Sequence, residues 1–193
     1  MKSIVVFCGS SEGNNPVYQE QAYALGKTMA AQGIQLVYGG AKVGLMGAVA
    51  DGVLQNGGSA IGVIPYFLQT KEIVHEGLTE LIVTETMHER KLKMHELSDG
   101  IITLPGGFGT MEEFFEMLTW AQLGLHQKPI GLLDTNGFYD NLFSLVNTMV
   151  GEGFLKASNR DMLLMNQNID DLLAQMSAYV APEVPKWVTK QTT

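Results

Sequence analysis

Short runs of apolar, mostly β-branched residues alternate along the chain with segments of helical periodicity, and this alternation constrains the fold more than any other feature. Residues 4–7 and 34–38 are typical of buried strands, and apolar residues at helical spacing over 18–29, followed by Gly33, indicate a helix between them. The pattern continues with strands predicted over 60–64, 81–83, 101–104 and 129–133 and helices over 46–53, 87–98, 110–123, 138–149 and 169–176. It predicts an α/β fold with a mostly parallel sheet and helices on both faces.

The chain has 193 residues, which suits a single domain with a full hydrophobic core. We find no internal repeat and no linker between the predicted elements. The segment after Pro182 contains Pro185 and ends in polar residues. We therefore expect one α/β domain over residues 1–182 and a C-terminal tail over 183–193.

The charge and the cysteine content exclude several classes of function. A formal net charge of −8 opposes binding to a nucleic acid polymer, although a small anion can still find a local positive site. Cys8 is the one cysteine, so an intrachain disulfide cannot form, and the scattered histidines complete no zinc motif. The apolar run 4–7 is too short for a signal peptide or a membrane span. We expect a cytoplasmic protein without membrane partner, metal or cofactor.

Three glycine-containing loops follow predicted strands and point to an anionic ligand. They are Gly9-Ser10-Ser11, the segment 39–47, and the segment 105–110. In parallel sheets the ligand binds beyond the carboxyl ends of the strands. Glycine lets backbone N–H groups approach a phosphate, and the helix that follows adds positive potential. A single such loop is more often a tight turn, but two at one sheet edge favour a phosphate site.

Two charged residues are the candidate catalytic groups. Arg90 falls on the apolar stripe of its predicted helix with Met87 and Met94, and an inward arginine requires an anion or a carboxylate. A structural salt bridge or a snorkelling side chain is an equal alternative. Glu113 also fits a capping box with Thr110 as the N-cap residue, which is the favoured local interpretation; the alternative is a carboxylate beside the phosphate loop.

The sequence resembles the LOG family. The segment 105–113 matches that family's PGGxGTxxE signature, 87–91 matches its arginine motif, and 38–47 resembles its first glycine loop. The match runs from about residue 7 to 134. One departure is Ala41, where the family commonly has a third glycine, so this position must tolerate a Cβ.

The resemblance implies a three-layer, modified Rossmann-type fold and a phosphoribohydrolase that cleaves the N-glycosidic bond of adenosine 5′-monophosphates, often N6-substituted, as in cytokinin activation. It carries the catalytic pair over to Arg90 and Glu113 and implies a homodimer or a larger homo-oligomer. The residues expected to contact the substrate are Gly9, Ser10, Gly39, Gly40, Gly44, Met46, Gly47, Met87, Lys91, Gly106, Gly107, Gly109, Thr110 and Glu116. For Met87 a core position is the favoured alternative, and for Glu116 the alternative is a solvent-facing position.

Two other functions fit parts of the sequence. The same loops suit a non-catalytic protein that binds a nucleotide or carries a phosphorylated cofactor; such a protein needs Arg90 but not Glu113 as well. The segment 9–13 formally matches the G-x-S-x-G motif of serine hydrolases. That motif requires a helix to start at once, whereas this chain runs on through Asn14 and Asn15, so we give a serine hydrolase little weight.

Overall fold

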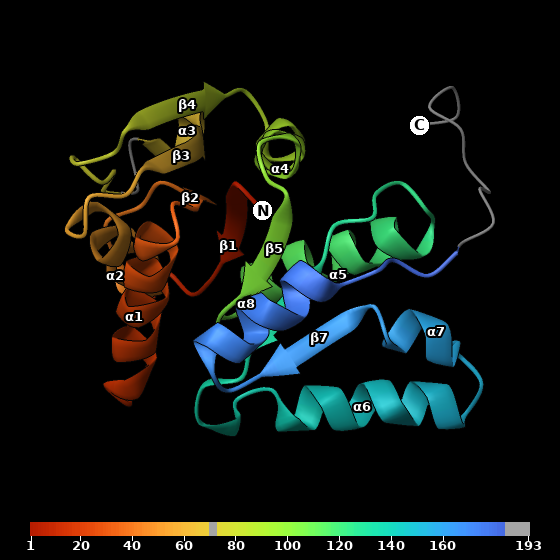
Figure 1. Ribbon diagram of the computed structural model, residues 1–193. Coiled ribbons are helices and arrows are strands. Elements are labelled where there is room, and N and C mark those ends of the chain that lie inside the picture. The colour runs from red at the N-terminus through yellow and green to blue at the C-terminus, as the bar shows by residue number, and fades with distance from the viewer. Residues whose placement is uncertain (70–72, 184–193) are drawn as a thin grey trace.

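A computed structural model describes residues 1–69 and 73–183. Within this range one sheet has the strand order β4-β3-β2-β1-β5-β6-β7, and every neighbouring pair of strands is parallel (Figure 1). The strands are β1 (Ser3–Phe7), β2 (Gln35–Tyr38), β3 (Ala60–Pro65), β4 (Glu80–Thr84), β5 (Gly100–Thr103), β6 (Ile130–Leu133) and β7 (Leu163–Asn166). The parallel sheet expected from the sequence is confirmed.

Helices cover both faces of the sheet and complete the three layers. One face packs against α1 (Val17–Ala31), α2 (Gly44–Leu54) and α8 (Ile169–Ala178), and the other against α4 (Met87–Glu96), α5 (Phe108–Gln122) and α6 (Asp140–Gly151). Short helical turns α3 (Tyr66–Gln69), η1 (Thr135–Gly137) and α7 (Ala157–Arg160) lie in the connections. Because the central strands are buried on both faces, their sequences are continuously apolar.

Side chains on the two faces of the sheet belong to two separate hydrophobic core clusters. In β1, Ile4 and Val6 join the cluster beneath α1, α2 and α8, whereas Val5 and Phe7 join the one beneath α4, α5 and α6. These four side chains are at most 2% exposed. Burial of this extent contributes about 2 kcal/mol for each large apolar side chain, so β1 is the central support of the sheet edge that carries the loops.

Helix α1 begins and ends close to the predicted residues. The side chain of Asn15 accepts a hydrogen bond from the Val17 N–H group, and Gly33 ends the helix with a φ of 68°. Helix α1 then crosses α2 at very short range. A Cβ added to Gly26 would lie 2.2 Å from the Val49 carbonyl oxygen, so this crossing requires glycine.

The start of α5 differs from the prediction. The helix begins at Phe108, with Gly107 as an N-cap residue in an extended conformation, φ −96° and ψ −155°, that makes no side-chain capping bond. Thr110 therefore lies inside the first turn and cannot be the N-cap residue, and the capping box expected for Thr110 and Glu113 is wrong. Because Glu113 has no capping function, its carboxyl group is available for another role.

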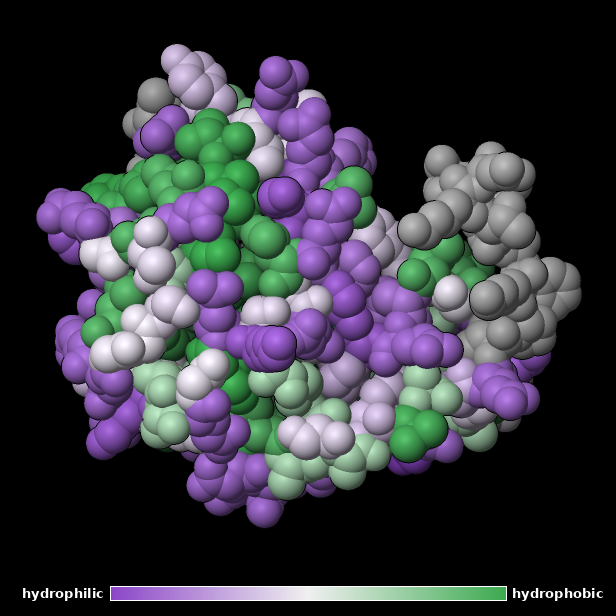
Figure 2. Space-filling model, turned by 45° about the horizontal axis from the view of Figure 1, so that its top comes forward, coloured by the Kyte–Doolittle hydropathy of each residue, from purple (hydrophilic) through white to green (hydrophobic). Residues whose placement is uncertain are grey.

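The surface and the chain end add two observations. Hydrophobic residues gather over the region of α3, β3 and β4, where Phe67 and Val83 are exposed, and hydrophilic residues follow α4 beside it (Figure 2). Among the helices of residues 1–69 and 73–183, none has the length and apolar character needed to cross a membrane.

The expected tail over 183–193 lies, apart from Glu183, outside the described residues.

Candidate active site at the switch point of the sheet

Strands β1 and β5 are neighbours in the sheet, but the chain leaves β1 towards β2 and leaves β5 towards β6, on the opposite side. Parallel sheets bind their ligands at such a switch point, beyond the carboxyl ends of the two strands. Backbone hydrogen bonds join three glycine loops there. The Gly9 N–H group donates to the Pro105 carbonyl oxygen at 3.0 Å, and the Leu45 N–H group donates to the Gly9 carbonyl oxygen at 3.1 Å. The structure thus brings together the three loops that the sequence predicted at one edge.

Two glycines make this close packing sterically feasible. Gly44 has a φ of 62°, and a Cβ there would lie 2.3 Å from the carbonyl carbon of Ser10. A Cβ on Gly106 would lie 2.2 Å from the Thr110 hydroxyl oxygen and 2.9 Å from the Gly9 nitrogen. Any side chain at either position would push the loops apart, so both glycines maintain the shape of the site.

The N-terminus of α5 offers free hydrogen-bond donors. Among the described residues, the N–H groups of Phe108, Gly109 and Thr110 have no backbone acceptor, and Gly107 provides no cap. Added Cβ atoms on Gly107 and Gly109 would meet nothing within 4 Å, so the space in front of this helix end is open. Free amides and the positive end of the helix dipole together favour an anion such as a phosphate.

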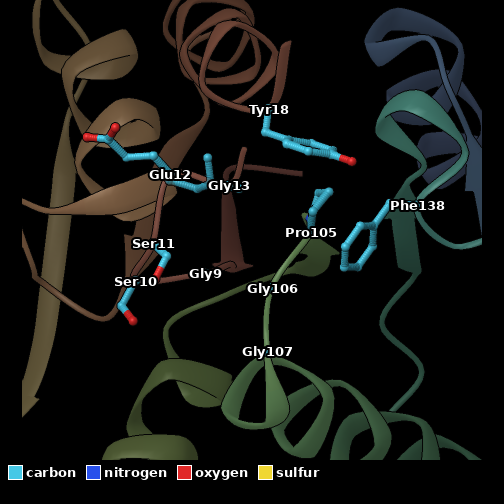
Figure 3. Close-up of a pocket in the computed structure, with 11 residues that line it drawn as sticks. Gly9, Ser10, Ser11, Glu12, Gly13, Tyr18, Pro105, Gly106, Gly107 and Phe138 are labelled. Atoms are coloured by element: carbon cyan, nitrogen blue, oxygen red, sulfur yellow. The ribbon is translucent and has the colours of Figure 1, made fainter. Parts of the chain in front are cut away.

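A pocket of about 330 Å³ adjoins this helix end on the side of α1. Its aromatic wall consists of Tyr18 and Phe138, whose ring centroids lie 6.0 Å apart in an edge-to-face arrangement. Figure 3 shows both rings near Pro105, opposite the loop that carries Ser10. Neither aromatic was predicted to line a pocket, because the helical spacing of Tyr18 and Phe138 indicated only packing positions on a helix.

Arg90 is buried at the other side of the loops, on α4. It is 7% exposed; its Nε atom donates to the Val63 carbonyl oxygen at 3.0 Å and its Nη2 atom to the Gly39 carbonyl oxygen at 3.4 Å. The predicted inward orientation of Arg90 is therefore confirmed. The guanidinium group is held by the ends of β2 and β3, beneath the first glycine loop.

Glu113 lies on α5, close enough to Arg90 for their charges to interact. Burial raises the pKa of the Glu113 carboxyl group to about 7, although Arg90 and, more weakly, Lys91 act to lower it. No nitrogen of Arg90 approaches a Glu113 oxygen within 4.0 Å in the described part of the chain. The two charges therefore interact without forming a direct ion pair. A carboxyl group that titrates near neutrality is suited to acid–base chemistry.

Lys91 and Glu116, both expected to contact substrate, contact each other. The Lys91 ammonium lies 3.0 Å from Glu116 and 2.6 Å from Glu112. Lys91 is 7% exposed, and although burial disfavours its charge, the hydrogen bonds that it donates to the two carboxylates raise its pKa above the ordinary value. The structure therefore shows this lysine as the counter-ion of the two carboxylates that flank Glu113.

The remaining predicted residues lie in or beneath the first glycine loop. Gly40 has a φ of 82°, and a Cβ on Gly47 would lie 2.0 Å from the Lys42 carbonyl oxygen, so both shape the turn. Met46 is 8% exposed and packs in the core. The sulfur of Met87 lies 4.0 Å from the Arg90 Nη1 atom.

Ala41 occupies the position where the LOG pattern commonly has glycine. It is fully buried and forms an isolated antiparallel bridge with Val74. Its Cβ is therefore accommodated in the core rather than in the space above the loop. In the described part of the chain, no group of three or more His, Cys, Asp or Glu side chains is arranged to hold a metal ion.

Comparisons with known proteins agree with the resemblance. Residues 46–176 match the family described as "Possible lysine decarboxylase". A probable cytokinin riboside 5′-monophosphate phosphoribohydrolase of Oryza sativa subsp. japonica is 47% identical over 176 residues, covering 91% of this chain and 79% of the relative. A cytokinin riboside 5′-monophosphate phosphoribohydrolase of Arabidopsis thaliana is 42% identical over 189 residues, covering 98% of this chain and 88% of the relative.

Solved structures share the fold at lower identity. The molybdenum cofactor binding protein of the phototrophic bacterium Rippkaea orientalis has a TM-score of 0.70 and 24% identity, covering 92% of this chain and 97% of that one. The Moco carrier protein of Chlamydomonas reinhardtii has a TM-score of 0.68 and 20% identity, covering 91% and 95%. At these identities the likeness establishes the architecture, and function must be argued from the site.

Proposed function

The chain belongs to the LOG family, and from this premise we propose that it is a phosphoribohydrolase that hydrolyses the N-glycosidic bond of adenosine 5′-monophosphates to the free base and ribose 5-phosphate. The substrate class includes N6-substituted nucleotides such as the cytokinin riboside 5′-monophosphates named for its relatives. One observation carries the proposal beyond the resemblance: a carboxyl group with a pKa of about 7, Glu113, lies on the helix whose N-terminal amides are free.

The proposed reaction needs an acid–base group and stabilisation of positive charge. Water adds to C1′ while the bond from C1′ to the base nitrogen breaks; the bonding electron pair stays with the base, which takes up a proton. The sugar ring is cationic in the transition state, as in glycoside hydrolysis. The ionised Glu113 carboxylate stabilises this charge or accepts a proton from the attacking water.

The loops and Arg90 supply the binding energy and the alignment. The phosphate is bound by the free N–H groups of α5, from Phe108 to Thr110, with Gly9 and Ser10 beside them. Arg90 keeps part of the Glu113 population ionised near neutral pH, because its charge acts to lower the pKa of that carboxyl group. This division of roles leaves the phosphate to the loop amides and assigns Arg90 to the Glu113 carboxylate.

The experiment is to incubate the purified protein with AMP and with N6-isopentenyl-AMP and to follow the free base by chromatography. We expect base release by the native protein and its loss in Glu113→Gln and Arg90→Ala. The faster substrate then reveals the preference at N6. Binding of either nucleotide without cleavage would instead support the carrier function and reject the hydrolase.

We propose further that the active protein is a cytoplasmic homodimer or larger homo-oligomer. Phe115 and Leu125, on α5 and at its exit, are 37% and 38% exposed, and Leu92 on α4 is 48% exposed. Phe114, by contrast, is fully buried in the core. Helix α5 therefore has one apolar face in the core and further apolar residues on the surface, where a second subunit could pack. Light scattering at micromolar concentration should give at least the mass of a dimer; a monomer mass would contradict this.

A further inference from the structure

The space beside Gly39, at the end of β2, is filled by an arginine side chain. A Cβ added to Gly39 would lie 2.3 Å from the Nη2 atom of Arg90 and 3.5 Å from its Cζ atom. The sulfur of Met46 would be 3.0 Å away. Real Cβ atoms do not approach other heavy atoms to 2.3 Å, so any side chain at position 39 must displace the guanidinium group or the strand end.

Backbone conformation does not explain the glycine. Gly39 is absent from the positive-φ glycines of the described chain, which include its neighbour Gly40 at 82°. An alanine at position 39 is therefore allowed by its φ angle, and what opposes it is the Arg90 side chain first and the Met46 sulfur second. A substitution at Gly39 therefore tests steric space without backbone strain. At Gly40, whose φ is positive, a substitution would change both at once.

The guanidinium group cannot easily move elsewhere. Arg90 is 7% exposed and donates to the Val63 carbonyl oxygen at 3.0 Å, and its charge interacts with Glu113. A displaced guanidinium would lose the weaker 3.4 Å bond to the Gly39 carbonyl oxygen and change its separation from Glu113. Met46, a flexible thioether, can adjust to an added methyl group more readily than a charge tethered by carbonyl oxygens.

We propose that Gly39 is a positioning residue for the reaction: its missing side chain provides the space in which the Arg90 guanidinium group is held at the distance from which its charge acts on Glu113. This inference rests on the proposed phosphoribohydrolase. It gives Gly39 a role that acts through Arg90, separate from the phosphate contact expected from its place in a glycine loop. The two residues are 51 positions apart in the sequence and share a function because β2 ends above α4.

The test is a double-mutant cycle of Gly39→Ala and Arg90→Lys. Lysine lacks the Nη2 atom, so the added methyl group meets no guanidinium in the Arg90→Lys background. We expect Gly39→Ala to lower kcat on the order of 10²-fold in the native background, as misplacement of a catalytic group does, and about 2-fold or less in the Arg90→Lys background. The acidic limb of the pH–rate profile should also move to higher pH, because a displaced Arg90 no longer lowers the Glu113 pKa.

Gly151→Ala is the matched control, since Gly151 ends α6 and a Cβ there meets nothing within 4 Å. We expect its kcat and KM to equal those of the native protein. Should Gly39→Ala instead raise KM equally in both backgrounds, with kcat preserved, Gly39 contacts the phosphate directly and the positioning role is rejected. Equal loss of kcat in both backgrounds would reject it as well.

Thermal unfolding of the same variants tests the steric contact independently of the proposed activity. Gly39→Ala should lower the Tm by roughly 5 °C in the native background and by clearly less in the Arg90→Lys background, because the clash is with Nη2. If the native protein releases no base, the hydrolase proposal fails while this cycle still measures the contact. Equal Tm losses in both backgrounds would overturn the inferred steric coupling.

Discussion

The ammonium group of Lys91 lies 3.0 Å from the Oε2 atom of Glu116, and the buried lysine and the half-buried glutamate form an ion pair between α4 and α5. The same ammonium lies 2.6 Å from Glu112. Glu113 follows Glu112 directly, and both neighbouring carboxylates raise its pKa while Lys91 lowers it. Lys91 therefore neutralises the charges that would otherwise suppress ionisation of the candidate catalytic carboxylate.

Replacement of Lys91 by methionine should shift the pH dependence of base release. Without the ammonium, only Arg90 still opposes the repulsion of the Glu113 carboxylate by Glu112 and Glu116, so the Glu113 pKa rises from about 7. A rise of about one pKa unit lowers the ionised fraction at pH 7 from about a half to about a tenth, so activity at pH 7 should fall about fivefold and recover at pH 9. Lys93→Met on the same helix serves as the control; an unshifted acidic limb in Lys91→Met would refute the counter-ion role.

Glu113→Gln should gain stability while it loses activity. The folded-state pKa of about 7 exceeds the usual 4.5, so this group contributes stability that is complete below pH 4.5 and disappears as the pH rises through 7. After discounting for partial exposure, the native protein should be less stable than the variant by about 1–2 kcal/mol at pH 8. Urea unfolding at pH 4 and pH 8 measures the difference, and a variant no more stable at pH 8 would contradict the elevated pKa.

Replacement of Gly26 by alanine should destabilise the fold without touching the site. A Cβ there would lie 2.2 Å from the Val49 carbonyl oxygen and 2.8 Å from the Val53 nitrogen, so α1 and α2 must separate. We expect a loss of about 2–3 kcal/mol and a Tm lower by roughly 5–10 °C, with kcat nearly unchanged at low temperature. Differential scanning calorimetry checks the stability, and Gly151→Ala, which has open space, should be neutral.

The elements that were predicted correctly are those whose periodicity is local. The apolar run 4–7 and the helical stripe 18–29 specify β1 and α1 because each pattern lies within one element. The strand β7 was missed because Leu163, Leu164 and Met165 carry no β-branched side chain. Its state depends on pairing with β6, in the register Ile130 to Leu163, which no local pattern encodes.

The sequence predicted which glycine loops form the site, but it did not predict the side-chain contacts around them. The burial of Arg90 followed from its position on an apolar stripe, whereas its neighbour at Gly39 lies 51 residues away. Lys91 and Glu112 are 21 residues apart and lie on different helices, so their pairing is a result of tertiary packing. At Thr110 a local capping pattern misled the prediction, because the extended Gly107 starts the helix earlier.

His95 should make the protein sensitive to acid. Its ring packs edge-to-face on Trp120, with centroids 5.4 Å apart, and lies 4.8 Å from the His126 ring. Burial, with smaller effects of the Lys128 and His126 charges, lowers the His95 pKa to about 4 from the usual 6.5. The unfolded chain then binds the proton more readily, so stability is lost as the pH falls from about 6.5 to 4.

The matching variant is His95→Phe, which keeps an aromatic ring on Trp120 and removes the titrating group. Because Glu113 acts with the opposite sign between pH 4.5 and 7, both proteins should carry Glu113→Gln. Between pH 6.5 and 4 the His95→Phe protein should then lose about 1–2 kcal/mol less stability than its parent. His88→Phe, exposed on the same helix, is the control. If urea unfolding gives both proteins the same pH slope, protonation of His95 is not coupled to folding, and the acid sensitivity must come from another buried group such as His126, whose pKa burial also lowers.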